Sequence, residues 1–278
     1  EDHQYTVPRA VQAANKLLRR DKVAIMLGSL GTPMNNAVLT DQLQMNVPNL
    51  FPLTAARSMY EPFHKFKFSS GSTYYDQVRT GIKYLVENNN RKNVCVLYED
   101  TDFGQEIVDA ANDQLRDMGM NLVEVASAKP TDTDFTAQIK KLRNADCDLV
   151  AMGTIVRTTI LPFMKAKEIG WTDVDFVTTS ASYYTVVAEQ PNGVMNGLYC
   201  LNSLVFPYYD TANNIERSWW DKFKNIYGYD PNTGAAYGYI FADILIEAVK
   251  RSGKNLTLDS FVASMETIHI AAYSHLLD

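Results

Sequence analysis

The stretch KVAIMLGSLGTPMNNAV, residues 22–38, decides the fold. It begins with a continuous apolar run, which is typical of a buried strand. A loop of small and hydroxyl-bearing residues follows from Gly28, and Pro33 suits the first turn of a helix. Free N–H groups at such a helix start favour a carboxylate or a phosphate. The stretch therefore predicts an α/β unit with an anion-binding loop, although an ordinary strand-to-helix turn would have the same pattern.

The same alternation continues along the chain and predicts βαβ units with parallel sheets flanked by helices. Expected strands span residues 22–28, 47–53, 93–100, 121–127, 147–153, 174–180 and 197–205. Expected helices span residues 8–20, 35–45, 72–89, 103–119, 132–145, 158–170, 212–227 and 234–252, with a short one from Thr257.

Three local details of these helices follow from side-chain chemistry. Asp132 or Thr133 is expected to cap the helix that follows it, and Asp100 or Asp102 the helix at 103–119. Pro162 should bend its helix or delay its start.

Composition excludes several classes of function. The chain has 278 residues and a net charge of −6, and no lysine or arginine cluster is dense enough for a nucleic-acid surface. No apolar run is long enough to cross a membrane. The length suits one large domain or two small ones.

The three cysteines, Cys95, Cys147 and Cys200, lie in or beside apolar runs. We expect them to be small buried hydrophobes. No pair of cysteines or histidines has the spacing of a zinc site, so we expect neither a metal nor a cofactor. An odd count of cysteines neither requires nor excludes an oxidising compartment.

Ligands of open parallel sheets bind at the carboxyl ends of strands. This rule selects the loops 28–34, 52–58, 98–104, 153–157 and 178–184. In the third loop, the acidic residues of YEDTDFGQE do not have the spacing of a calcium loop, and Phe103 is expected to point into a cleft or the core. In the last loop, Tyr183 or Tyr184 could stack on a ligand or belong to the core.

A catalytic triad is hard to assemble from this sequence. The four histidines lie outside the selected loops, and the chain has no GxSxG elbow. We therefore expect a binding protein rather than an enzyme, with a small-molecule hydrolase or transferase as a remaining alternative.

The order of several stretches resembles a known family. They are PRAVQAANKLLRRDKVAIMLGSLGT, NLFPLTAA, VCVLYEDTDFGQE, DTDFTAQIKKLRNADCDLVAMGT and YGYDPNTGAAYGYIFADILIEAVKRSG. Together they look like periplasmic substrate-binding proteins of the branched-chain amino-acid (Leu/Ile/Val) type, which serve ABC importers. The resemblance covers nearly the whole chain, and it implies a type I fold with two α/β lobes that close on a ligand.

The resemblance also implies lobe boundaries. Residues 1–73 and 204–266 would form lobe one and residues 74–203 lobe two, with 267–278 a truncated return to the hinge. Since family members begin with a further strand and end with strands that cross between the lobes, we expect the chain to lack pieces at both ends.

Site residues follow from the same resemblance. The loop containing Ser29, Gly31 and Thr32 would hold a ligand carboxylate, with Thr32 as the hydroxyl donor. The remaining expected ligand contacts are Thr54, Ala55, Phe103, Thr154, Ile155, Ser180, Tyr183 and Tyr184.

Ser180 departs from the family pattern. Amino-acid binders commonly place an acidic residue near this position to pair with the ligand ammonium, whereas this chain reads TTSASYY. A buried ammonium without a counter-charge would be costly. We therefore expect a carboxylate on an apolar or aromatic body and favour aromatic acids, with branched-chain amino acids, amides and urea-like ligands as alternatives.

The resemblance implies a monomeric periplasmic receptor whose partners are a small-molecule ligand and the membrane subunits of an ABC permease. The alternative on the same fold is a sensor or regulator that responds to an amide or an amino acid.

Overall fold

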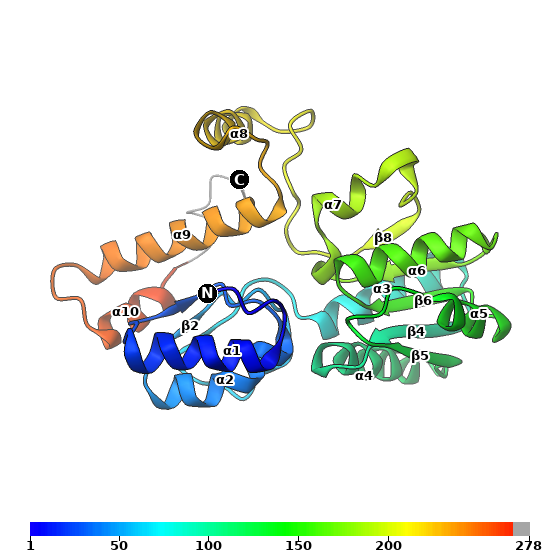
Figure 1. Cartoon of the computed structure of the whole chain (residues 1–278), viewed down its shortest axis with the longest axis horizontal. Helices are drawn as coiled ribbons and strands as arrows, with labels where there is room; N and C mark the ends of the chain where they lie inside the picture. The colour runs from blue at the N-terminus through cyan, green and yellow to red at the C-terminus, as the bar shows by residue number, and fades with distance from the viewer. Residues whose placement is uncertain (269–278) are drawn as a thin grey trace.

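The computed structural model describes residues 1–268. It contains two separate parallel sheets, of three and five strands, each flanked by helices (Figure 1). We call the part around the three-stranded sheet lobe one and the part around the five-stranded sheet lobe two. In Figure 1, lobe one lies on the left and lobe two on the right. The expected parallel α/β architecture is confirmed.

Lobe two is a three-layer sandwich whose strands lie in the order β5-β4-β6-β7-β8, all parallel. The strands are β4 (Val94–Glu99), β5 (Glu124–Ala128), β6 (Leu149–Gly153), β7 (Asp175–Thr178) and β8 (Leu198–Cys200). The helices are α3 (Tyr74–Asn89), α4 (Asp102–Asp117), α5 (Thr136–Asn144), α6 (Val156–Glu168) and the short α7 (Thr185–Ala188).

Alternate residues of β4 pack on opposite faces of this sheet. Val94 and Val96 join the cluster under α3 and α4, whereas Cys95 and Leu97 join the cluster under α5 and α6. Both faces are buried, which explains why the strands are continuous apolar runs in the sequence. The sandwich brings the carboxyl ends of all five strands to one edge.

Two of the three cysteines are joined, contrary to the expectation that all are free. Cys95 of β4 and Cys147, just before β6, form a disulfide with Cα atoms 5.9 Å apart. They are buried as expected, but the pairing arises because β4 and β6 are adjacent strands. Cys200 is free and half-buried.

Lobe one has the sheet order β1-β2-β3, also parallel. Its strands are β1 (Met26–Leu27), β2 (Asn49–Leu50) and β3 (Lys67–Phe68). Its helices are α1 (Val7–Asn15), which continues as a π-helical turn over Lys16–Arg20, then α2 (Thr32–Gln44), α8 (Asn214–Tyr227), α9 (Thr233–Ser252) and α10 (Leu258–Glu266). One apolar cluster joins α1 to α2, and another joins β2 to α8, α9 and α10.

The strands of lobe one are shorter than the sequence predicts. Pro48 and Pro52 flank the central strand β2, and proline has no N–H to extend a ladder. An isolated bridge between Leu30 and Leu53 continues the pairing beyond the strands. The sequence reading missed β3, whose two residues do not form an apolar run.

The expected helix caps were wrong in lobe two. Thr101 caps α4, and its hydroxyl oxygen accepts the Gly104 N–H at 3.3 Å. The N-cap position of α5 is Phe135, which has no capping side chain, and the preceding Asp134 accepts the Thr136 N–H at 2.9 Å. In both cases the accepting side chain belongs to a residue just before the helix, which lies close to the unpaired N–H groups of the first turn.

Pro162 does not delay its helix, because α6 begins at Val156 and contains the proline. Within residues 1–268, no helix combines the length and apolar character needed to cross a membrane. Most of the expected hinge segment 267–278 lies outside the described residues.

Candidate functional site

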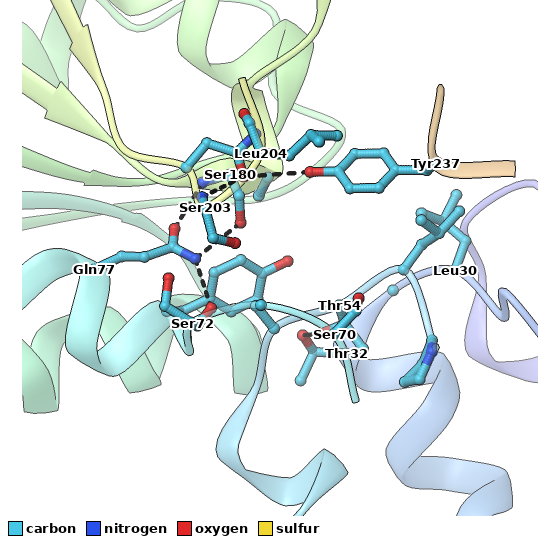
Figure 2. A pocket seen from close by; sticks show the side chains of 18 of the residues that line it. Leu30, Thr32, Thr54, Ser70, Ser72, Gln77, Ser180, Ser203, Leu204 and Tyr237 are labelled. Carbon is cyan, nitrogen blue, oxygen red and sulfur yellow. Dashed lines mark hydrogen bonds between the residues drawn. The ribbon is translucent and has the colours of Figure 1, made fainter. Parts of the chain in front are cut away.

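The carboxyl ends of the strands in both lobes face one cavity of about 470 Å³ (Figure 2). Lobe one contributes Tyr5, Leu30, Gly31, Thr32, Pro52, Leu53, Thr54, Ala55, Ser70, Gly71, Ser72, Leu204, Tyr237, Ile240, Phe241 and Ile244. Lobe two contributes Tyr74, Gln77, Phe103, Ile155, Val156, Ser180, Ala181 and Tyr184, and Asn202 and Ser203 line the connection between the lobes. This is the strand-end location at which open α/β sheets bind ligands.

Two threonine hydroxyls form one polar group of the cavity. Thr32 is the first residue of α2, and its Oγ1 lies 2.6 Å from the Oγ1 of Thr54. Thr54 Oγ1 also accepts the Ala56 N–H at 3.3 Å. Both side chains are buried, the pair uses one hydroxyl hydrogen between its members, and the Thr54 side chain also interacts with the Tyr74 hydroxyl. The group can hold an acceptor oxygen beside the positive end of α2.

Gly31 permits this approach. Its φ of 91° is unfavourable for other residues, and a Cβ there would lie 2.1 Å from Met34 Cε and 2.9 Å from the Tyr5 ring. Only a glycine at this N-cap lets α2 start against the cavity.

A second polar group lies across the cavity in lobe two. Gln77 of α3 hydrogen-bonds both the backbone and the side chain of Ser180, in the loop after β7. Figure 2 shows Gln77 and Ser180 on one side and Thr32 and Thr54 on the other. A ligand with two polar groups could therefore bridge the two lobes.

A further wall of the cavity, from α9, is apolar. Tyr237, Ile240, Phe241 and Ile244 follow one another at helical spacing along α9 and face the cavity. Phe241 also stacks on Phe51 with ring centroids 5.1 Å apart, so the wall is continuous with the core of lobe one. Such a surface suits the hydrocarbon body of a ligand.

Aromatic rings line the cavity from both lobes. Phe103 contacts Tyr74 edge to face at 4.8 Å and is 2% exposed, so it belongs both to the core and to the cavity wall, two locations that the sequence left as alternatives. Burial raises the pKa of Tyr184, and it raises the pKa of Tyr237 to about 12. Both phenols are therefore neutral at ordinary pH and act only as hydrogen-bonding groups.

Among the described residues, no aspartate, glutamate, lysine, arginine or histidine lines the cavity. The buried carboxyl of Glu99 lies behind the wall, where it accepts hydrogen bonds from the Thr158 hydroxyl and the Ile155 N–H. Burial raises the pKa of Glu99, and its Oε2 has no partner. The cavity thus offers hydroxyls, amides and apolar surface, but no full charge.

Polar contacts join the lobes at the rim of the cavity. The Arg57 N–H of lobe one donates to Glu106 Oε1 at 3.0 Å, and the Arg57 Nε lies 3.4 Å from the same oxygen. Asn36 donates to Asp102 Oδ2 at 2.8 Å, and the Ser58 hydroxyl donates to Asn36. Burial raises the pKa of Glu106. These contacts hold α2 and the segment at 57–58 against the first turns of α4.

Most residues expected at the site lie together on the cavity wall. They are Gly31, Thr32, Thr54, Ala55, Phe103, Ile155, Ser180 and Tyr184.

Three expected residues lie outside the lining. Ser29 uses its carbonyl oxygen for bonds within lobe one. Thr154 is fully buried, with its hydroxyl 2.6 Å from that of Thr159. Tyr183 turns toward the other side of its loop, where its oxygen accepts the Phe206 N–H at 3.1 Å. The neighbouring Tyr184 is therefore the tyrosine that faces the cavity.

Sequence reasoning missed the α9 wall, Tyr5, Gln77 and the two serine-containing segments at 70–72 and 202–204. The sequence does show apolar residues at helical spacing along α9. A helix that packs in the core has the same pattern, so the spacing alone did not identify a cavity wall. Within the described residues, no group of three or more His, Cys, Asp and Glu side chains could hold a metal ion.

A sequence model described as "Periplasmic binding protein" matches residues 1–276. The chain belongs to this family. The expected resemblance is thereby confirmed, and because the family is one of binding proteins, the expectation of binding without catalysis agrees with it.

Curated relatives of this family member are distant. A Leu/Ile/Val/Thr-binding protein of Salmonella typhimurium is 21% identical over 194 residues, covering 67% of this chain and 52% of that protein. A Leu/Ile/Val-binding protein homolog of Brucella abortus is 21% identical over 161 residues, covering 57% of this chain and 40% of that protein. The chain spans about half the length of these relatives or less.

Solved structures share the fold of this periplasmic binding protein. A leucine-binding protein from Thermotoga maritima has a TM-score of 0.82 at 17% identity, covering 95% of this chain and 74% of that one. A fatty acid ABC transporter substrate-binding protein from Thermomonospora curvata has a TM-score of 0.84 at 19% identity, covering 96% and 68%. The predicted type I fold is confirmed by these likenesses.

Proposed function

We propose that the chain is the ligand-binding part of an extracytoplasmic receptor for an ABC importer, and that it binds a small carboxylate with an apolar body. The observation that carries the proposal is the interlobe cavity, which has hydroxyl donors at the start of α2, an apolar wall from α9 and no charged lining within the described residues. The six aromatic side chains of the lining support the proposal of an aromatic body.

Lobe closure is the proposed mechanism of binding. The ligand carboxylate accepts hydrogen bonds from the Thr32–Thr54 pair and the free N–H groups of α2, while its body packs on α9 and Phe103. Because the lining comes from both lobes, a ligand stabilises the arrangement in which they meet. The receptor then releases the ligand unchanged to a permease.

The proposed lobes are residues 1–73 with 204–266, and residues 74–203. Two observations support these boundaries. Tyr74 begins α3, which packs in lobe two, and Leu204 joins the apolar cluster around α9 in lobe one.

A periplasmic location is supported by the Cys95–Cys147 disulfide, because such bonds persist in oxidising compartments. The proposed receptor acts as a monomer and delivers its ligand to the membrane subunits of the importer.

A thermal-shift screen tests the function. Aromatic and aliphatic monocarboxylates are compared with their uncharged methyl esters, and bound material is recovered and identified by mass spectrometry. A carboxylate at about one hundred times its Kd should stabilise the folded chain by about 2.7 kcal/mol. The proposal fails if the esters stabilise as well as the acids, or if the recovered ligand has been chemically altered.

A ligand sensor is the second candidate. It is favoured by the likeness to glutamate receptor 2.2 of Arabidopsis thaliana, which is 24% identical over 265 residues, covering 84% of this chain and 27% of that protein. Ligand-dependent stimulation of an importer reconstituted with this chain would favour the transport role over the sensor role.

A further inference from the structure

The carboxamide of Gln77 is held in one orientation. The side chain is 5% exposed and lies between α3 and the loop after β7. Its Oε1 lies 2.9 Å from the Ser180 backbone nitrogen, which can only donate. Its Nε2 lies 2.8 Å from the Ser72 carbonyl oxygen, which can only accept. The two contacts leave no freedom to exchange the oxygen and nitrogen of the amide.

This orientation fixes the role of the Ser180 hydroxyl. Gln77 Nε2 also lies 3.1 Å from Ser180 Oγ, and an amide nitrogen can only donate. Ser180 Oγ is therefore the acceptor in this bond, and its own hydrogen points elsewhere. Within the described part of the chain, no other hydrogen bond involves that hydroxyl, and Ser180 lines the cavity.

The other polar groups near Ser180 do not supply a negative charge. The Ser203 N–H donates to Asn202 Oδ1, so that oxygen accepts from the Tyr237 hydroxyl at 3.2 Å. Tyr237 keeps lone pairs toward the cavity but no charge. A ligand ammonium here would meet only neutral acceptors, the remaining lone pair of Ser180 Oγ and the Tyr237 oxygen, and no carboxylate to compensate for the loss of its hydration.

We propose that Gln77 fixes the Ser180 hydroxyl as a donor, so that lobe two recognises an acceptor oxygen on the ligand and discriminates against an amine. The inference rests on the proposed carboxylate function and narrows it. The substrate class is a carboxylic acid that carries a keto or hydroxyl oxygen beside its apolar body. Ser180 contacts that oxygen, and Gln77 is a positioning residue.

A matched ligand series tests this inference in the unmodified chain. Phenylalanine, phenylpyruvate, phenyllactate and phenylpropanoate share one body and one carboxylate and differ in a single group. Isothermal titration should give Kd values about tenfold or more tighter for the two oxygen-bearing acids than for the amino acid or the unsubstituted acid. The leucine series, with leucine and its oxo, hydroxy and unsubstituted acids, should rank in the same order.

A Gln77→Glu variant replaces the donating amide nitrogen of residue 77 with an accepting oxygen. The ionised carboxylate accepts from the Ser180 N–H and hydroxyl, gives up the bond to the Ser72 carbonyl oxygen, and adds a charge that favours an ammonium. We expect the ranking to change by about tenfold in favour of the amino acid. Gln12→Glu, which adds the same charge at an exposed position of α1, should leave the ranking unchanged. Ser180→Asp provides a second route to the same inversion if Gln77→Glu does not fold.

The outcomes separate the two proposals. Tighter binding of phenylalanine or leucine to the unmodified chain overturns this inference and leaves the receptor function standing. Equal binding of the unsubstituted and oxygen-bearing acids also overturns it, because the Ser180 hydroxyl would then not be used. If no acid of either series binds, the proposed carboxylate function fails, and this inference fails with it.

Discussion

The side-chain nitrogen of Asn36, in α2 of lobe one, lies 2.8 Å from Asp102 Oδ2, at the start of α4 in lobe two. Asn36 lies about one helical turn after Thr32 in α2, and Asp102 directly precedes Phe103 in α4. A contact between the lobes is thus placed within one helical turn of the ligand cavity. Closure and ligand binding are expected to be coupled through it.

Replacing Asp102 with alanine tests this coupling. Asp102→Ala removes an exposed interlobe hydrogen bond, so ligand affinity should fall by about two- to fivefold although no ligand contact is lost. Titration gives the affinity, and small-angle scattering gives the radius of gyration, which should rise in the ligand-free variant. Asp109→Ala, on the exposed face of the same helix, is the control. If both variants bind alike, the contact does not favour the closed form.

Thr32 is expected to be the main side-chain donor for the carboxylate. Thr32→Val keeps the shape of the side chain but removes the hydroxyl that pairs with Thr54, so carboxylate affinity should fall by about ten- to a hundredfold. Binding of the matched methyl ester should change much less. Thr40→Val, exposed on the same helix, serves as the reference. Unchanged carboxylate affinity would remove Thr32 from the site.

Glu99 should make stability depend on pH. Burial raises its pKa above the ordinary value of 4.5 in the folded chain. Between 4.5 and the folded-state pKa, the folded chain keeps a proton that the unfolded chain has released, so stability falls as pH rises through this window. Glu99→Gln should remove this loss, so its melting temperature relative to the unmodified chain should increase from about pH 4 to pH 8.

The control for this titration is Glu87→Gln, an exposed position of α3, whose melting curve should stay parallel to that of the unmodified chain. A constant difference between the Glu99→Gln variant and the unmodified chain across the pH range would contradict the account.

The disulfide should stabilise lobe two. It closes a loop with a sequence separation of 52, so the Cys95→Ala/Cys147→Ala double variant should lose about 2–4 kcal/mol of unfolding free energy. Cys200→Ala removes a free cysteine and should lose about 1 kcal/mol or less. Denaturant titration of the three oxidised proteins measures both losses. Equal stability of the double and single variants would show that the bond contributes nothing.

Sequence predicted lobe two better than lobe one. The strands β4 and β6 are buried on both faces, so their apolar runs stand out from the helices between them. Lobe one pairs only two residues per strand, prolines flank β2, and β3 consists of Lys67 and Phe68 alone. Such short strand pairings depend on contacts with segments distant in the sequence, so the local hydrophobic pattern does not predict them.

The sequence predicted those residues of the cavity wall that lie in a single loop after a strand. Gly31, Thr32 and Phe103 follow strands directly, and the strand-end rule places them on the cavity wall. Gln77 was missed because its role depends on two partners from separate segments, Ser72 and Ser180. The Cys95–Cys147 pairing was missed for the same reason, since only the strand order brings these residues together.

A crystal structure of the chain with phenylpyruvate bound tests the central claim most directly. The account predicts an intact ligand in the interlobe cavity, with carboxylate oxygens within hydrogen-bond distance of Thr32 and the keto oxygen within that distance of the Ser180 hydroxyl. A ligand bound outside this cavity, turned with its carboxylate away from Thr32, or converted to a product would contradict the account.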